Sequence, residues 1–115
     1  MTLEEFYEGL GDFALMQRHI SNTDAIRRFV FMFRDDDHFD QLVEAMDAGD
    51  VETAFQCAHT IKGMCQNLCL TNVTEVTIPV VEALRSGDIT LAKLSFPSLE
   101  QTYKELLWRL DELDA

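Results

Sequence analysis

One histidine of this 115-residue chain stands in a setting that suits phosphoryl chemistry. His59 lies in a stretch of helical periodicity, with Lys62 three residues later and Gly63 four residues later. Residues three and four apart share a helix face, so the lysine ammonium is within side-chain reach of the imidazole. A neutral imidazole is a competent nucleophile, and a lysine can act as a point-charge partner of a phosphoryl group. His59 alone would be an ordinary surface histidine; its neighbours favour a phosphoryl carrier.

Gly63 strengthens this interpretation. A glycine inside a helix costs about 1 kcal/mol relative to alanine and usually reflects the close approach of something else. Here it removes the side chain that would stand over the imidazole, which leaves room for a second protein. The helix also holds a single acidic residue, Glu52, in a chain that contains 21. On the same polar side we expect three residues to contact a partner: Gln56, Gln66 and Asn67.

Helical periodicity dominates the chain, and we find no convincing strand alternation. The helix that carries His59 is predicted over about residues 51–70, with Asp50 as its cap after Gly49. Short helical pieces are predicted after a capping box of Thr2 and Glu5 and over residues 13–20. Later helices are expected from about residue 73 to 86 and from as early as residue 90 to 113. We expect Asn72 with Glu75 to cap the former, Pro79 to kink it or shift its start, and Pro97 to disturb the latter.

The stretch from Asp24 to Ala48 leaves two possibilities open. Its apolar residues mark two faces that would be rotated by more than a right angle on a continuous helix. Either the helix breaks near residues 35–37, or it is one long helix whose first half lies between other helices; the continuous form is slightly favoured. Within it, the apolar segment Phe29–Phe33 is mostly expected in the core, with one or two side chains free to form a docking patch beside His59.

Four amphipathic helices with short connections predict an all-α fold, an antiparallel up-down-up-down four-helix bundle with one or two short N-terminal helices. We expect one domain over residues 1–115, with the short helices in residues 1–22 and the bundle in residues 23–114.

Composition excludes several classes of function. The net charge of −12 argues against sequence-independent nucleic-acid binding and against anionic membranes. No apolar run approaches the roughly 20 residues of a membrane span, and the acidic N-terminus lacks the features of a signal peptide. Three cysteines without a CxxC motif are expected as small core residues in a reduced, cytoplasmic setting: Cys57, Cys65 and Cys69.

Other chemistry finds little support. Asp35 and His38 have a spacing close to that of di-iron bundles. Such sites need two of these motifs and two further inward-facing carboxylates, and the chain has only this one motif, with Asp in place of Glu. There is no P-loop or other glycine-rich nucleotide loop. We therefore expect neither a metal nor a cofactor.

The segment Ala58-His59-Thr60-Ile61-Lys62-Gly63, followed by Asn67-Leu68, resembles the signature of histidine-containing phosphotransfer (HPt) domains. The resemblance extends over about residues 24–113 and includes the run from Glu82 to Asp88. It implies a four-helix bundle with one long Asp24–Ala48 helix. It also implies His59 as phosphoacceptor, Lys62 as the cation that stabilises the phosphoryl group, and Gly63 as clearance for the partner.

The sequence departs from the family pattern at two positions. Cys69 stands where the family usually has glycine, and Gln66 stands where it has a small residue. Cys69 is on the apolar face, so we expect it to alter packing. Gln66 is on the exposed face, where it narrows the docking surface or contacts the partner.

By this resemblance the chain is a phosphorelay carrier without kinase activity of its own. It would accept a phosphoryl group from a receiver-domain aspartate or a hybrid sensor histidine kinase and pass it to a response regulator. Mg²⁺ would be held by the receiver, and we expect a monomer. One alternative is an adaptor that binds a receiver or kinase without phosphotransfer. Another is the substrate domain of a larger sensor kinase, although Met1 and the acidic tail are typical of a complete short protein.

Overall fold

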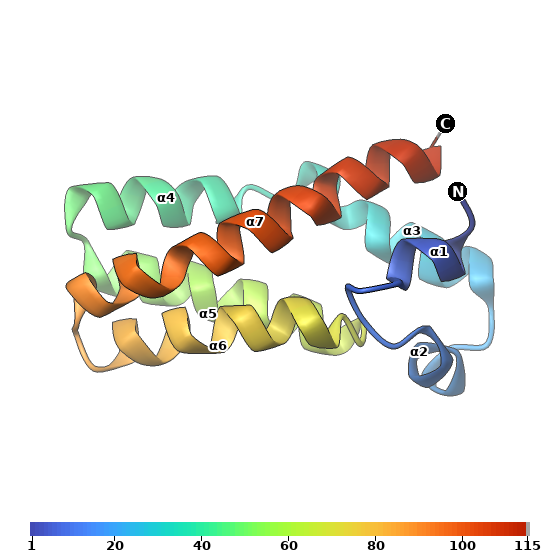
Figure 1. Cartoon of the computed structure of the whole chain (residues 1–115), viewed down its shortest axis with the longest axis horizontal. Coiled ribbons are helices and arrows are strands. Elements are labelled where there is room, and N and C mark those ends of the chain that lie inside the picture. Colours follow the sequence, from blue (N-terminus) through green and yellow to red (C-terminus); the bar gives the residue numbers. More distant parts are fainter. Residues whose placement is uncertain (115) are drawn as a thin grey trace.

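The structure, a computed structural model, describes residues 1–114, and all regular structure in that range is helical. This confirms the predicted all-α class. Seven helices follow one another within these described residues (Figure 1): α1 (Leu3–Tyr7), α2 (Phe13–His19), α3 (Thr23–Asp35), α4 (His38–Ala48), α5 (Val51–Asn67), α6 (Thr71–Arg85) and α7 (Ile89–Asp114).

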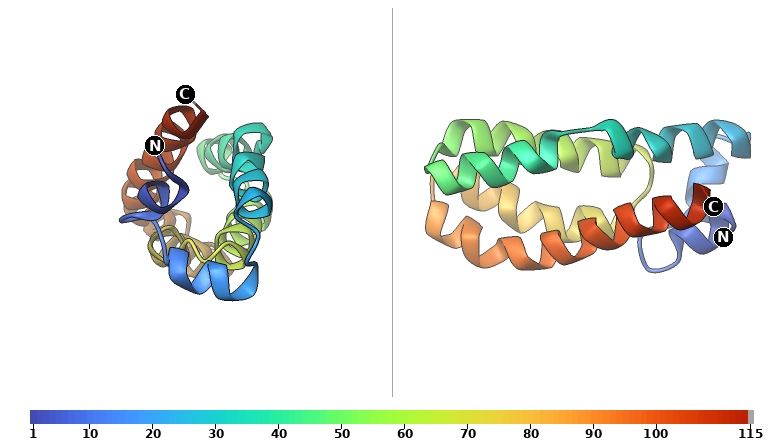
Figure 2. Two further views of the ribbon diagram at one scale, coloured as in Figure 1. Left: turned by 90° about the vertical axis from the view of Figure 1, so that its right-hand side faces the viewer. Right: turned by 90° about the horizontal axis from the view of Figure 1, so that it is seen from above.

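Helices α4 to α7 form the body of the bundle. Each packs against the next one along the chain and runs in the opposite direction (Figures 1 and 2). Aromatic rings join the first of them to the last: the Phe39 ring of α4 stacks on Tyr103 of α7 at 4.4 Å between centroids and on Phe96 at 5.6 Å. Apolar side chains from all four helices fill the centre, among them Leu42, Ile61, Val80 and Leu106.

The predicted long helix from Asp24 to Ala48 is wrong: α3 ends at Asp35 and α4 begins at His38. The intervening Asp36 has an extended backbone, and its carboxylate accepts a hydrogen bond from the His38 amide at 3.0 Å and lies 2.7 Å from His38 Nδ1. Such local side-chain bonds offer the backbone an alternative to the helix. The break also resolves the two rotated apolar faces, since Val30 on α3 and Leu42 on α4 are both fully buried.

Several predicted helix ends are confirmed. Thr2 and Glu5 form the capping box of α1, Gly49 takes the left-handed conformation after α4 at φ 71°, and Asp50 caps α5 through the Thr53 amide. Helix α5 ends at Asn67, three residues before the predicted end. The two prolines, Pro79 and Pro97, lie inside α6 and α7, and α6 begins at Thr71 rather than later.

The prediction that Asn72 caps α6 is also wrong. Leu70 is the N-cap residue, and the Asn72 side-chain amide instead donates to the Gly9 carbonyl at 2.8 Å. This bond belongs to a set that ties the N-terminal segment to the α5–α6 turn. The Tyr7 hydroxyl donates to the Leu68 carbonyl at 2.8 Å, and the Asp12 amide donates to the Cys69 carbonyl at 2.9 Å.

The N-terminal helices therefore close one end of the bundle (Figure 1). Arg109 of α7 secures α1 from the other side, through a hydrogen bond of 3.0 Å to the Phe6 carbonyl. Helix α3 is held to the same end, since Arg27 donates to the Leu113 carbonyl at 2.9 Å. Within residues 1–114, no helix is both long enough and apolar enough to cross a membrane.

Candidate functional site

Helix α5 separates a buried face from a polar one, and His59 is exposed on the polar face. The buried face consists of Ala54, Cys57, Ala58, Ile61 and Cys65. Asp50 fixes the start of the helix by accepting a hydrogen bond from the Thr53 amide at 3.1 Å. Hydrogen bonding with the Thr53 side chain, and then with its amide, lowers the pKa of the Asp50 carboxyl group. The ionised carboxylate suits the positive end of the helix dipole. The imidazole thus stands on a helix that is anchored in the core and capped at its start.

Lys62 and Gly63 occupy the next turn of α5, and both are partly buried. A Cβ atom added to Gly63 would meet no heavy atom within 4 Å, so this glycine is not required for packing inside the chain. The space over this turn is therefore open to another molecule. The structure agrees with the sequence in placing His59, Lys62 and Gly63 on one helix within two turns.

The three residues expected to contact a partner, Gln56, Gln66 and Asn67, are all exposed on α5. Helical spacing places Gln56 and Asn67 on the same side of His59. Gln66 lies about two turns beyond the imidazole. Their contact with a partner stays a prediction.

Cys69 differs from its prediction in an informative way. It is buried, as expected for a residue of the apolar face, but its backbone adopts φ 53°, the left-handed conformation that favours glycine. The residue follows the end of α5, where a left-handed conformation is common in helix termination. The cysteine at this position, where the family usually has glycine, therefore has to adopt a backbone conformation that favours glycine. The pattern of apolar residues did not predict this conformation.

Sequence reasoning missed the aromatic neighbour of the imidazole. Phe55 lies one turn before His59; its side chain is half-buried, and its ring centroid lies 5.6 Å from that of His59. The Arg85 guanidinium of α6 lies over the same ring, 5.0 Å from its centroid. The four-residue spacing of Phe55 and His59 was the available signal. The arginine could not be placed, because it comes from another helix.

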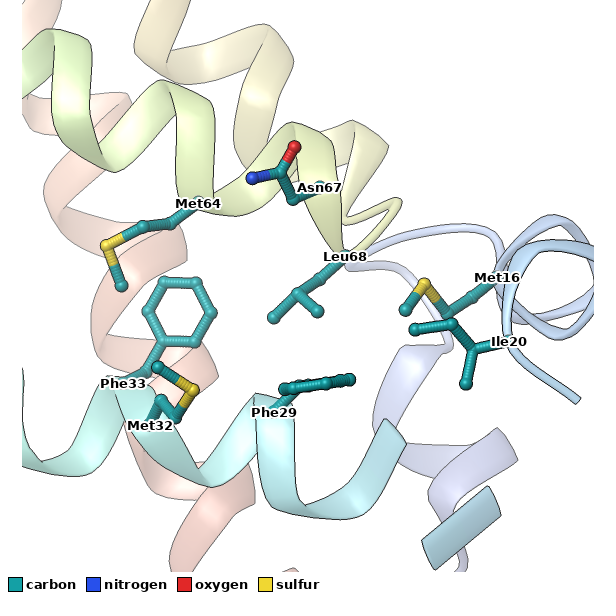
Figure 3. Close-up of a pocket in the computed structure, with 8 residues that line it drawn as sticks. All are labelled: Met16, Ile20, Phe29, Met32, Phe33, Met64, Asn67 and Leu68. Carbon is teal, nitrogen blue, oxygen red and sulfur yellow. The ribbon is translucent and has the colours of Figure 1, made fainter. Parts of the chain in front are cut away.

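An apolar groove runs beside the polar face, between α2, α3 and α5 (Figure 3). Phe29 and Met32 of α3 border it and are 38% and 61% exposed, which confirms that part of the Phe29–Phe33 segment is accessible. The groove has a volume of about 350 Å³ and is lined by Met16, Ile20, Phe29, Met32, Phe33, Met64, Asn67 and Leu68. Asn67 belongs to both the groove and the polar face of α5.

The three cysteines are buried free thiols, which confirms their placement in the core. Burial raises the pKa of Cys57 and Cys69, and it raises that of Cys65 to about 12. A thiol must ionise to act as a nucleophile or a metal ligand, so these side chains suit packing. Among residues 1–114, no three His, Cys, Asp or Glu side chains are grouped so that they could hold a metal ion.

Comparison with known protein families gives one match. The family model described as Hpt domain matches residues 30–112, which is most of the chain and includes all of α4, α5 and α6. Neither the curated proteins nor the solved structures gave a match. Helices α1 and α2 precede the matched range, although they pack on the α5–α6 turn inside it.

Proposed function

Since this chain belongs to the Hpt domain family, we propose that it carries phosphoryl groups between proteins of a phosphorelay, with His59 as the acceptor. The observation that carries the proposal is the exposed imidazole on a core-anchored helix, next to a lysine and to a glycine that faces open space. The donors and acceptors that fit are receiver-domain aspartates and, as a donor, a hybrid sensor histidine kinase.

The chemistry needs one nucleophile from this chain. An unprotonated imidazole nitrogen of His59 attacks the phosphorus of an aspartyl phosphate on the receiver. The N–P bond forms, the P–O bond breaks, and its electron pair remains on the released carboxylate. The proton of the other ring nitrogen can pass to water. Transfer onward reverses these steps, with the next aspartate as nucleophile. The Mg²⁺ that neutralises charge around the aspartyl phosphate belongs to the receiver.

Lys62 and Gly63 have separate roles in this proposal. The Lys62 ammonium, three residues from His59, offsets the negative charge that arrives with the phosphoryl group. Gly63 leaves room for the receiver to approach α5 until the phosphorus of its aspartyl phosphate is within bonding distance of the imidazole nitrogen. A side chain at this position would stand in the open space that the structure leaves there.

In this proposal the receiver binds in the apolar groove. It adjoins the polar face of α5 through Asn67, and the exposed Phe29 and Met32 supply apolar contact area. Burying these apolar side chains against the receiver would stabilise the complex. The polar side chains of Gln56 and Gln66, at the rim of the contact, would make receiver binding specific. Three free thiols in the core fit a reduced cytoplasmic setting, which is also part of the proposal.

Transfer from phosphorylated receiver domains of the same organism tests the proposal. We expect the wild-type chain to acquire an acid-labile label and His59→Gln to acquire none. His38→Gln is the matched control, because it removes a partly exposed imidazole elsewhere and should leave labelling unchanged. Label on His59→Gln would refute the acceptor role. A receiver that binds wild type and His59→Gln alike, without transfer, would favour the adaptor alternative.

A further inference from the structure

Three large apolar side chains of α7 lie exposed on the outer side of the bundle. Leu91, Leu94 and Trp108 are 47%, 74% and 54% exposed, while Leu99 and Leu106 on the opposite face of the helix are fully buried. A single exposed apolar residue is normal on a protein surface. Apolar residues that recur along one face of a helix instead indicate a surface that another molecule covers.

The spacing on this face is that of a helix–helix contact. Leu94, Ser98, Gln101, Glu105 and Trp108 follow one another at alternating intervals of four and three residues. Such intervals place side chains in one line along a helix, as in the seam of a coiled coil. These five residues are called the α7 strip below. The strip is apolar at its two ends and polar in its centre.

The α7 strip is complementary to itself. Leu94 and Trp108 lie seven residues on either side of Gln101. If a second copy of the chain packs antiparallel on this face, with the two-fold axis at Gln101, the Leu94 side chain of each copy meets the Trp108 ring of the other. A contact of this kind is isologous and closes as a dimer.

The charges beside the strip match in the same arrangement. Lys93 comes opposite Asp111 of the second copy, which is 77% exposed although it also pairs with Arg34 of its own chain at 3.5 Å. Lys104 and Glu100, which pair at 3.7 Å within one chain, come within a turn of each other across the dimer. Opposite charges therefore meet at this surface in spite of the net charge of −12.

The charge in the centre of the strip is already paired. The Glu105 carboxylate lies 2.9 Å from Arg109 Nε of the same chain. Ser98, Gln101 and Glu105 also border an open polar hollow of about 490 Å³ between α6, α7 and the segment after α1. Water can remain in such a polar centre when two copies associate. The contact therefore suits reversible association.

Pairing through the α7 strip leaves the candidate site free. Helix α5 packs against α4 and α6, whereas α7 packs against α6, and α5 and α7 lie at opposite corners of the bundle (Figure 2). The polar face of α5 thus points away from the strip. A dimer of this kind presents two accessible His59 imidazoles.

We propose that the α7 strip binds a second copy of this chain, antiparallel and with two-fold symmetry, in a reversible homodimer. The inference goes beyond the proposed function and does not depend on the role of His59. From the sequence we expect a monomer; that the fold leaves this face of α7 uncovered is visible only in the structure.

Trp108 allows association at this surface to be measured directly, because it is the single tryptophan of the chain. Sedimentation equilibrium and tryptophan emission are followed between about 5 and about 300 µM, and we expect a dissociation constant of about 10–100 µM. The emission should shift to shorter wavelength with the same midpoint as the mass, because the indole leaves water. The mass of one chain at every concentration would overturn the proposal, and so would a dimer whose emission is unchanged.

A matched pair of variants tests the apolar contact. Leu94→Glu should raise the dissociation constant at least tenfold, because the change occurs twice in the symmetric contact and sets a carboxylate against each Trp108 ring. Ile78→Glu adds the same charge at an exposed apolar position of α6 and should associate like the wild-type chain. Circular dichroism checks that both variants are folded. Equal dissociation constants for the two variants would contradict the proposed surface.

Chemical cross-linking tests the orientation of the two copies. The natural thiols are buried, so a short bis-maleimide should react with a cysteine introduced on α7. Gln101→Cys lies on the two-fold axis and should give a covalent dimer. Thr90→Cys should give none, because its two positions are roughly 33 Å apart in the antiparallel pair, at 1.5 Å per residue. Cross-linking of Thr90→Cys as efficient as that of Gln101→Cys would overturn the antiparallel arrangement.

Discussion

Gly63 is the position where stability and function are expected to oppose each other. Nothing within 4 Å would meet an added Cβ, and alanine is the better helix former by about 1 kcal/mol. We therefore expect Gly63→Ala to raise the free energy of unfolding by about this amount in urea titration.

The same variant should lose transfer from a phosphorylated receiver, because its methyl group stands where the receiver must approach. Labelling of His59 by phosphoramidate should be unchanged, since that donor is small. Unchanged receiver transfer would show that Gly63 does not clear the docking surface.

Cys69 presents the reverse situation, a side chain where the backbone favours glycine. Its φ of 53° costs a residue with a Cβ roughly 1–2 kcal/mol that glycine avoids. Cys69→Ala and Cys69→Gly both remove the sulfur, so their difference isolates the backbone. We expect the glycine variant to be the more stable of the two by about 1 kcal/mol in urea titration. Equal stabilities would mean that the turn relaxes to another conformation.

At the scale of elements, the junction between the N-terminal segment and the bundle contains one very close backbone approach, at Gly11. An added Cβ on Gly11 would lie 2.3 Å from the Cys69 carbonyl oxygen and 2.7 Å from Leu70 Cα, both of which are backbone. Neither can move without displacing the α5–α6 turn. Helix α2 also supplies Met16 and Ile20 to the groove beside the site.

We expect Gly11→Ala to lower the free energy of unfolding by about 1–3 kcal/mol, as overpacking does. Amide exchange in residues 1–20 should accelerate more than exchange in α6, because the N-terminal segment detaches first. Receiver affinity should fall as one wall of the groove is lost. For the stability and amide-exchange measurements, Gly63→Ala is the control, because its added methyl group meets no atom of the chain within 4 Å. If the amides of residues 1–20 in Gly11→Ala exchanged as slowly as they do in the wild-type chain, this explanation would be contradicted.

At the scale of the whole molecule, burial of ionisable groups makes stability depend on alkaline pH. Burial raises the pKa of Cys65 to about 12, and it also raises the pKa of Tyr7 and Tyr103. An unfolded cysteine ionises near 8.5, so above that pH the unfolded chain binds fewer protons than the folded one. The stabilisation is complete below about pH 8.5 and is lost as pH rises toward the folded-state pKa.

We expect the free energy of unfolding to fall between pH 8 and pH 10.5, with Cys65 accounting for about 2–3 kcal/mol of the loss. Urea titrations across this range measure it. Cys65→Ala should be less stable at pH 8 but should show a clearly smaller pH slope. An identical slope in both proteins would mean that Cys65 does not cause the alkaline loss.

The sequence by itself determined the class of fold, the main helices and the central site residues, because these depend on local periodicity and spacing. His59, Lys62 and Gly63 lie within two turns of one helix wherever that helix packs, and Gly49 with Asp50 marks a helix boundary through local bonds. Only the tertiary structure decided which residues of different segments contact each other. The break at Asp36, the bond from Asn72 to Gly9, and the place of Arg85 over Phe55 all involve competition or contact between segments. Helical periodicity describes one element at a time, so it could not rank a local carboxylate bond against helix continuity or bring two helices into register.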